Sequence, residues 1–298
     1  MVELKKIATE QRNPDTMDID NLSTLDMVKL INREDHKVAE AVSLVTDKIA
    51  EAVDLIADRL GKGGRLIYCG AGTSGRLGIL DAVECPPTYS TEPEMVQCLM
   101  AGGYGAIFKA VEGAEDSKEL GVQDMKEACF TAADVLVGIA ASGRTPYVLG
   151  CMEYAKELGA ATVAVTCCPD SVLDTFADIG IAPAPGPEVV TGSTRMKSGT
   201  AQKMVLNMLS TGAMIKLGKV YGNLMVDVKP SNEKLIHRCV TIVCAATECD
   251  EAAAVAALEA CDYRPKTAIV MILCGVDAEE ARAMLEKAGG RVAKVLNS

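Results

Sequence analysis

The chain of 298 residues contains no tryptophan, only 3% aromatic residues and only two histidines. It also has no apolar run near the roughly 20 residues that a membrane-spanning helix needs, so we expect no membrane partner. Basic residues are in deficit, because 30 Lys and Arg stand against 41 Asp and Glu and give a net charge of −11. We therefore expect no general nucleic-acid surface, and any bound phosphate must be attracted by local groups.

Cysteine is abundant, but the 12 cysteines follow no disulfide or metal-binding spacing. Because His36 and His237 are the only histidines and no Cys/His cluster has zinc spacing, we expect no metal and no other cofactor. The opening residues (MVELKK) lack the apolar segment of a signal peptide. We therefore expect a cytoplasmic protein whose reduced cysteines pack as small core residues.

The most informative stretch spans residues 65–76 (RLIYCGAGTSGR). It predicts a short buried strand, a tight turn and a helix that begins near Ser74. Gly70 and Gly72 let the backbone approach a ligand closely, and the first N–H groups of the helix would point at it. Thr73 and Ser74 add hydroxyl groups. The pattern is typical of a phosphate-binding turn.

Two other interpretations fit the same turn: the dinucleotide pattern G-x-G-x-x-G, or a strand–helix turn that binds nothing. A second loop with the same chemistry, at residues 141–146 (ASGRTP), argues against both, because it also follows an apolar run, at residues 134–140. In an open parallel sheet the two loops would meet at the carboxyl edge, where such sheets bind ligands. This favours a sugar phosphate. The candidate binding residues of the second loop are Ser142, Gly143 and Thr145.

A third loop follows the proline-rich residues 183–187 and contributes Ser193 and Thr194. We expect one of these two residues to be the N-cap of a helix that runs to residue 217. Alternation of strand and helix patterns predicts an α/β fold with a doubly wound parallel sheet of about five strands. The expected strands are residues 65–69, 95–100, 134–140, 161–166 and 178–182.

Helical patterns flank this region on both sides. Apolar residues at steps of three and four predict one long amphipathic helix over residues 33–60, which would cover the sheet or form a subunit interface. Beyond residue 230 the pattern is helical only. We therefore divide the chain into an N-terminal arm and helix (1–60), a sugar-phosphate domain (61–230) and a helical C-terminal unit (231–298).

The position of Glu84 points to a functional role. Pro86 and Pro87 predict the end of the helix that begins near Ser74, which would place Glu84 in its last turn. There the negative end of the helix dipole disfavours a charged carboxylate. A purely structural sequence would more often have lysine at this position.

Five segments together resemble one known family. They are residues 9–14 (TEQRNP), 69–78 (CGAGTSGRLG), 84–88 (ECPPT), 111–116 (VEGAED) and 192–197 (GSTRMK). They resemble the N-acetylmuramic acid 6-phosphate etherases, bacterial cell-wall recycling enzymes built on a sugar isomerase (SIS) domain. The resemblance implies a homodimer that cleaves the D-lactyl ether of the substrate, without a metal, to N-acetylglucosamine 6-phosphate and D-lactate.

The resemblance also implies that Glu84 and Glu115 are the acid–base pair. In the open-chain sugar the C1 aldehyde acidifies the C2 proton, so one carboxylate removes that proton while the other protonates the departing lactate. Water then adds to the unsaturated aldehyde. We assign proton donation to Glu84 and C2 deprotonation to Glu115.

Two alternatives stay open at this point. The first is a non-catalytic sugar-phosphate sensor, because the glucokinase regulatory protein resembles the same family, although it is much longer and has two SIS units. The second is an aldose–ketose isomerase, which needs a base but no acid for a leaving group. One SIS unit in 298 residues, together with both glutamates, favours the etherase.

Overall fold

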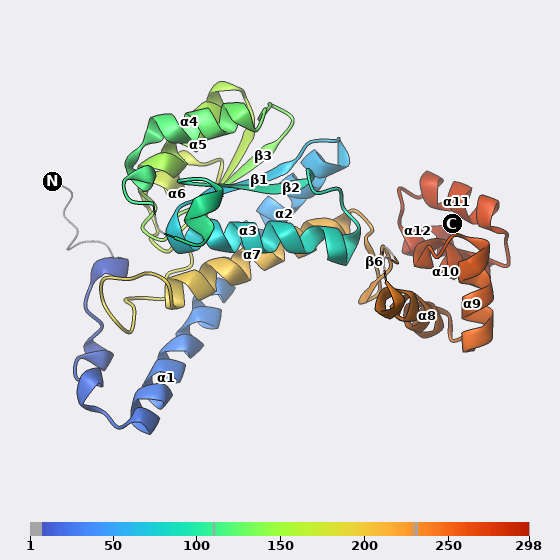
Figure 1. The fold of residues 1–298 in the computed structure, drawn as a ribbon, viewed down its shortest axis with the longest axis horizontal. Coiled ribbons are helices and arrows are strands. Elements are labelled where there is room, and N and C mark those ends of the chain that lie inside the picture. Colours follow the sequence, from blue (N-terminus) through green and yellow to red (C-terminus); the bar gives the residue numbers. More distant parts are fainter. Residues whose placement is uncertain (1–7, 110, 229, 231, 298) are drawn as a thin grey trace. The chain divides into compact units, whose positions relative to one another are not determined.

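The computed structural model describes residues 8–109, 111–228, 230 and 232–297. The chain forms two compact units (Figure 1). The first consists of Met1–Ala82 and Glu94–Ser210, and the second of Val83–Pro93 and Thr211–Ser298.

The first unit is built on a parallel sheet with strand order β2-β1-β3-β4-β5, which confirms the predicted fold class. Leu66 pairs with Val96 on one side and with Val135 on the other, so the three strands end level at the carboxyl edge. The strands are β1 (Leu66–Gly70), β2 (Val96–Met100), β3 (Val135–Ile139), β4 (Ala161–Val165) and β5 (Ile179–Ile181).

Helices cover both faces of this sheet, with α4 and α5 on one face and α3 and α7 on the other (Figure 1). Every residue of β1, β3 and β4 is buried, which explains their continuous apolar runs. Ile67 and Leu136 pack with Val148 and Met152 of α5. The helices are α1 (Thr24–Ser43), α2 (Thr46–Gly61), α3 (Gly72–Tyr89), α4 (Lys118–Glu127), α5 (Pro146–Glu157), α6 (Val172–Phe176) and α7 (Lys197–Lys216).

The prediction of one helix over residues 33–60 is wrong. The chain forms α1 and α2, and Val45 between them has non-helical backbone angles (φ −120°, ψ 13°). Ser43 donates its hydroxyl to Glu40 O, and Thr46 donates its hydroxyl to Ser43 O. Such side-chain bonds compete with the helical backbone pattern, while the apolar periodicity continues unchanged across the break.

The prediction that two prolines end the helix after Glu84 is also wrong. Helix α3 continues through Pro86 and Pro87 to Tyr89. The two prolines remove two N–H donors, but the buried Cys85 anchors this part of the helix. Glu84 therefore lies before the last turn, and the dipole argument for its role as the acid loses its basis.

The second unit is mainly helical. The sequence analysis did not foresee its short hairpin of β6 (Val220–Tyr221) and β7 (Leu224–Met225). Its core includes Val226, Val243, Leu258 and Ile269, all fully buried. The helices are α8 (Glu233–Thr247), α9 (Glu251–Ala260), α10 (Pro265–Cys274), α11 (Ala278–Lys287) and α12 (Val292–Leu296).

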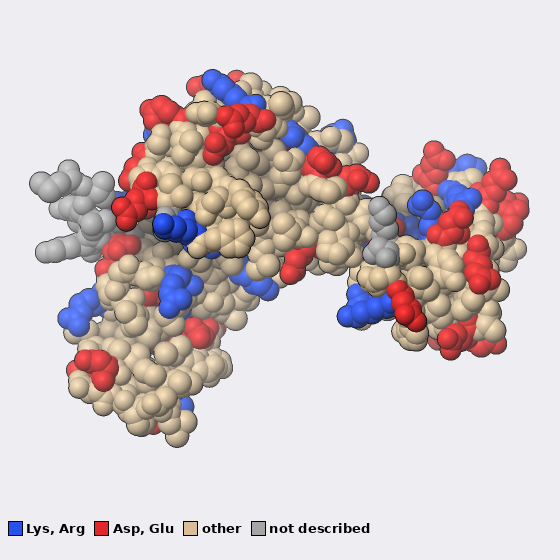
Figure 2. All heavy atoms as spheres, in the orientation of Figure 1, with Lys and Arg blue, Asp and Glu red and all other residues tan. Residues whose placement is uncertain are grey.

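The surface is mixed in charge. On the face shown in Figure 2, Lys and Arg side chains are scattered among Asp and Glu and form no continuous basic patch. In the described part of the chain, no helix is both long and apolar enough to cross a membrane.

Candidate functional site

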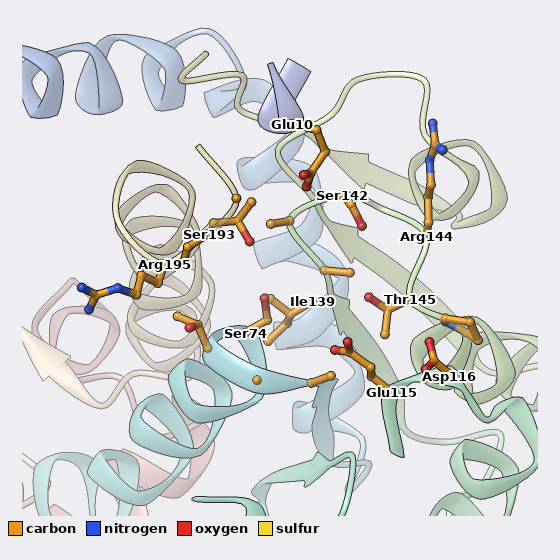
Figure 3. A pocket seen from close by; sticks show the side chains of 18 residues that line it. Glu10, Ser74, Glu115, Asp116, Ile139, Ser142, Arg144, Thr145, Ser193 and Arg195 are labelled. Carbon is orange, nitrogen blue, oxygen red and sulfur yellow. The ribbon is translucent and has the colours of Figure 1, made fainter. Parts of the chain in front are cut away.

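A cavity of about 570 Å³ in the first unit is the candidate site. Its volume lies in the range of small-molecule sites. It opens at the carboxyl edge of the sheet, where the loops after β1 and β3 meet the loop before α7 (Figure 3). Residues proposed from the sequence that line it are Gly72, Thr73, Ser74, Glu115, Ser142, Thr145, Ser193 and Thr194.

The first loop brings backbone N–H groups to the cavity. Helix α3 begins at Gly72, slightly earlier than expected, and its first hydrogen bond runs from Gly75 N to Ala71 O. The N–H groups of Gly72, Thr73 and Ser74 precede that bond and are available to an anion. A Cβ on Gly75 would lie only 2.8 Å from Gly70 O, so this close strand–helix approach requires glycine.

Ser74 contributes less through its side chain than the sequence suggested. Its hydroxyl is buried and donates to Gln202 Oε1 at 2.8 Å. The hydroxyl proton is therefore already used within the protein. Its backbone N–H is the group that the helix start presents to a ligand.

The second loop supplies hydroxyl groups. In Figure 3 the side chains of Ser142 and Thr145 extend from this loop toward the cavity. Thr145 is the N-cap of α5, yet its side chain makes no capping hydrogen bond. Gly143 does not line the cavity; it shapes the loop, since its φ is +67° and a Cβ there would lie 2.0 Å from Ser171 Oγ. The second helix start thus leaves both hydroxyls for a ligand.

The third loop differs from its prediction. Neither Ser193 nor Thr194 caps α7, which begins only at Lys197. Instead the fully buried carboxylate of Glu188 accepts hydrogen bonds from Lys197 N at 2.8 Å and Ser198 N at 3.0 Å. The N–H groups of Lys197 and Ser198 are therefore already bonded to an anion of the protein and are not free for a ligand.

Two arginines that line the cavity were not among the proposed site residues. Arg144 and Arg195 come from the second and third loops, and in Figure 3 their guanidinium groups extend away from the cavity centre. Lys197 is not available either, because its buried ammonium binds Glu34 Oε2 at 2.8 Å. Helix N–H groups and loop hydroxyls therefore supply donors in the cavity, whose lining also includes the carboxylates of Glu10, Glu115 and Asp116.

Glu34 connects the N-terminal arm to α7. Its carboxylate binds Lys197, accepts a hydrogen bond from Asn13 Nδ2 at 2.8 Å and contacts Lys37 at 2.6 Å. Burial by itself would raise the pKa of Glu34, but the hydrogen bonds from Lys197, Lys37 and Asn13 outweigh it and lower the pKa to about 2. Glu34 is therefore ionised at neutral pH.

This network fixes the arm, which brings Glu10 to the cavity wall (Figure 3). Thr16 donates its hydroxyl to Val189 O at 2.9 Å, and Thr9 contacts Cys168 Sγ at 3.6 Å. The sequence analysis missed Glu10 as a site residue. The motif at residues 9–14 was the available signal, but nothing local shows that the arm reaches the sheet edge.

The two proposed catalytic glutamates lie in different settings. Glu115 is on a 3₁₀ turn (Ala114–Asp116) and lines the cavity with Asp116. Glu84 is exposed and does not line the cavity. It follows Ser74 by ten residues on the same helix, which corresponds to roughly 15 Å along the axis. The cavity of a single chain thus brings Glu115, but not Glu84, to the phosphate-binding loops.

Comparisons with known proteins agree with this geometry. The SIS domain model matches residues 117–212, and the model of the glucokinase regulatory protein N-terminal SIS domain matches residues 48–156. An N-acetylmuramic acid 6-phosphate etherase from Photorhabdus laumondii subsp. laumondii is 58% identical over 297 residues, covering 100% of this chain and 99% of that one. The etherase from Clostridium beijerinckii is 58% identical over 293 residues, covering 98% and 96%. The chain belongs to the N-acetylmuramic acid 6-phosphate etherase family of SIS-domain proteins.

Proposed function

We propose that this protein is a carbon–oxygen lyase that cleaves the D-lactyl ether of N-acetylmuramic acid 6-phosphate in cytoplasmic cell-wall sugar recycling. The observation that carries the proposal is the family relationship over the full chain at 58% identity. The cavity supports it, because a carboxylate, Glu115, lines the same cavity as two helix starts and several hydroxyl groups.

The phosphate of the substrate binds at the starts of α3 and α5. Free N–H groups at residues 72–74 and the hydroxyls of Ser142 and Thr145 surround it. Thr73, Ser193 and Thr194 complete the hydroxyl lining. Neutral donors suffice here because the dipoles of two helices add partial positive charge.

Glu115 removes the C2 proton of the open-chain sugar. The C1 aldehyde takes up the electron pair as an enolate, the C3–O bond then breaks, and the ether oxygen leaves as the hydroxyl of D-lactate after protonation. Water adds to C3 and a proton returns to C2, which gives N-acetylglucosamine 6-phosphate. Positioned acid–base groups of this kind contribute about 10²–10⁴-fold to the rate.

Glu84 remains the proposed proton donor, and its position favours a homodimer. Because it lies roughly 15 Å along α3 from the phosphate-binding start, we infer that the partner copy supplies it. Leu25 and Val28 on α1 are 64% and 53% exposed, and Leu80 on α3 is 44% exposed. Such uncovered apolar side chains are what a subunit interface would bury.

The direct test is to incubate purified protein with N-acetylmuramic acid 6-phosphate and to assay D-lactate. The etherase releases one D-lactate per sugar. A sensor binds the sugar phosphate and releases none, while an isomerase changes the sugar and keeps the ether.

A further inference from the structure

A smaller cavity of about 190 Å³ adjoins the candidate site within the first unit. The two cavities share Ala71, Gly72 and Glu115 in their walls, so Glu115 lies where they meet. Sites that hold a whole small molecule usually begin near roughly 300 Å³. The smaller cavity therefore has room for one substituent of a ligand whose main part occupies the larger cavity.

Much of the lining of this smaller cavity is apolar. Met100 at the end of β2, with Ala101 and Ala106 after it, lines the space although each is at most 5% exposed. Val111 is 48% exposed and forms a wall on the solvent side. It packs so closely on Gly102 that a Cβ there would lie 2.8 Å from Val111 Cβ. Because burying a methyl group against such surface is favourable, the lining suits a ligand group with a small apolar end.

Arg76 on α3 supplies hydrogen-bond donors to the same cavity. Its Nε donates to Ile107 O and its Nη2 donates to Ala106 O, both at 2.8 Å. These bonds fix the guanidinium against the 3₁₀ turn Tyr104–Ile107. A guanidinium has five N–H donors, so the two bonds leave others for a carbonyl oxygen of a ligand.

The charges in the smaller cavity disfavour an anionic group. Its lining contains the carboxylates of Glu112 and Glu115 against the single cation of Arg76. A phosphate, or the carboxylate of the lactyl group, would add negative charge to a lining that already has an excess of it. A neutral group with one acceptor and one donor fits better, because Arg76 can donate to the acceptor and Glu112 can accept from the donor.

The proposed reaction connects this cavity to one atom of the substrate. C2 of the sugar carries both the proton that Glu115 removes and the nitrogen of the acetamido group. When C2 lies beside Glu115, the acetamido group therefore starts one bond away from the place where the two cavities meet. This group is neutral and has one N–H donor, one carbonyl acceptor and a terminal methyl, which match the features of the lining.

We propose that the smaller cavity is the subsite for the acetamido group and selects 2-acetamido sugars, an inference that rests on the proposed function. The methyl group packs against the apolar lining, the carbonyl oxygen accepts from Arg76, and the N–H donates to Glu112. Filling the subsite orients C2 so that its proton faces Glu115. Arg76 and Val111 thereby determine specificity without taking part in proton transfer.

The test compares two ligands by calorimetry on the full chain: N-acetylglucosamine 6-phosphate, and glucose 6-phosphate, which has a hydroxyl at C2 instead. Val111→Phe fills the smaller cavity from its solvent side. It should weaken binding of the acetamido sugar about tenfold, because methyl burial and an amide hydrogen bond are lost, and leave binding of glucose 6-phosphate unchanged. Val111→Ala enlarges the cavity and should bind N-butanoylglucosamine 6-phosphate more tightly than the wild type does.

A matched control is Val172→Phe, because Val172 is 50% exposed and lines neither cavity. This variant should bind both sugars as the wild type does. Equal effects of Val111→Phe on the two sugars, or no gain for the butanoyl sugar in Val111→Ala, would overturn the proposal. Weaker binding of the lactyl substrate with unchanged binding of N-acetylglucosamine 6-phosphate would also overturn it, by assigning the cavity to the lactyl group. If the wild type releases D-lactate in such a case, only the subsite is wrong, whereas no D-lactate release by the wild type would overturn the proposed function itself.

Discussion

Glu34→Gln should destabilise the first unit strongly, because it removes the charge that neutralises the buried Lys197. The carboxylate and ammonium lie 2.8 Å apart, and each side chain is only 1% exposed. Removing one partner of such a buried pair typically costs about 3–5 kcal/mol. This is a large fraction of the roughly 5–15 kcal/mol that stabilises a typical folded protein.

The pKa of Glu34 gives a second route to the magnitude. A fall from its ordinary value of 4.5 to about 2 corresponds to about 3 kcal/mol, at 1.36 kcal/mol per pKa unit. Because the folded-state pKa is the lower one, this stabilisation is present above pH 4.5 and is lost as the pH falls toward about 2. The stability difference between wild type and Glu34→Gln should therefore shrink across that window.

Urea unfolding followed by circular dichroism, repeated between neutral pH and about pH 3, measures both effects. Lys37→Gln is the matched control, because Lys37 also binds Glu34 but its side chain is 43% exposed. Such a pair is worth at most about 1 kcal/mol. Equal losses in the two variants, or a difference between wild type and Glu34→Gln that does not change with pH, would refute the reasoning.

Three further predictions concern the proposed reaction and assembly. Ser142→Ala should raise KM for the phosphorylated sugar and weaken product binding about tenfold, because a hydrogen bond to the phosphate is lost. Unchanged product binding, measured by calorimetry, would show that the phosphate binds elsewhere. Glu84→Gln should still exchange solvent deuterium into C2 of the sugar, while its rate of lactate release falls about 10²–10⁴-fold. Glu115→Gln should lose both C2 exchange and lactate release. NMR in D₂O with a lactate assay distinguishes these outcomes, and the reverse pattern would exchange the roles of the two glutamates. If the partner copy supplies Glu84, mixing the Glu84→Gln and Glu115→Gln variants should restore about a quarter of the wild-type rate, and no recovery on mixing would count against this assembly. Leu25→Glu should give a monomer by light scattering, and a dimer like that of the wild type would also count against it.

The sheet could be predicted from the sequence because its strands are short, apolar on both faces and separated by helical patterns. All five predicted strands occur within a residue or two of the expected positions. The two loops after β1 and β3 were located for the same reason, since each follows a recognisable strand directly.

Features that depend on tertiary contacts could not be predicted. Glu188 replaces the expected N-cap of α7, although it lies nine residues before the helix start in the sequence. Glu10 reaches the cavity because contacts distant in sequence hold the arm, such as that of Asn13 with the buried Glu34. In α3 the local rule that proline ends a helix was overridden where Cys85 is buried.

The most direct test of the central claim is the reaction itself, carried out in H₂¹⁸O and separately in D₂O. Elimination followed by water addition breaks the bond between C3 and the ether oxygen. We therefore expect ¹⁸O at C3 of N-acetylglucosamine 6-phosphate, deuterium at C2 and an unlabelled hydroxyl oxygen in D-lactate. Label in the lactate hydroxyl, or product without deuterium at C2, would contradict the proposed mechanism.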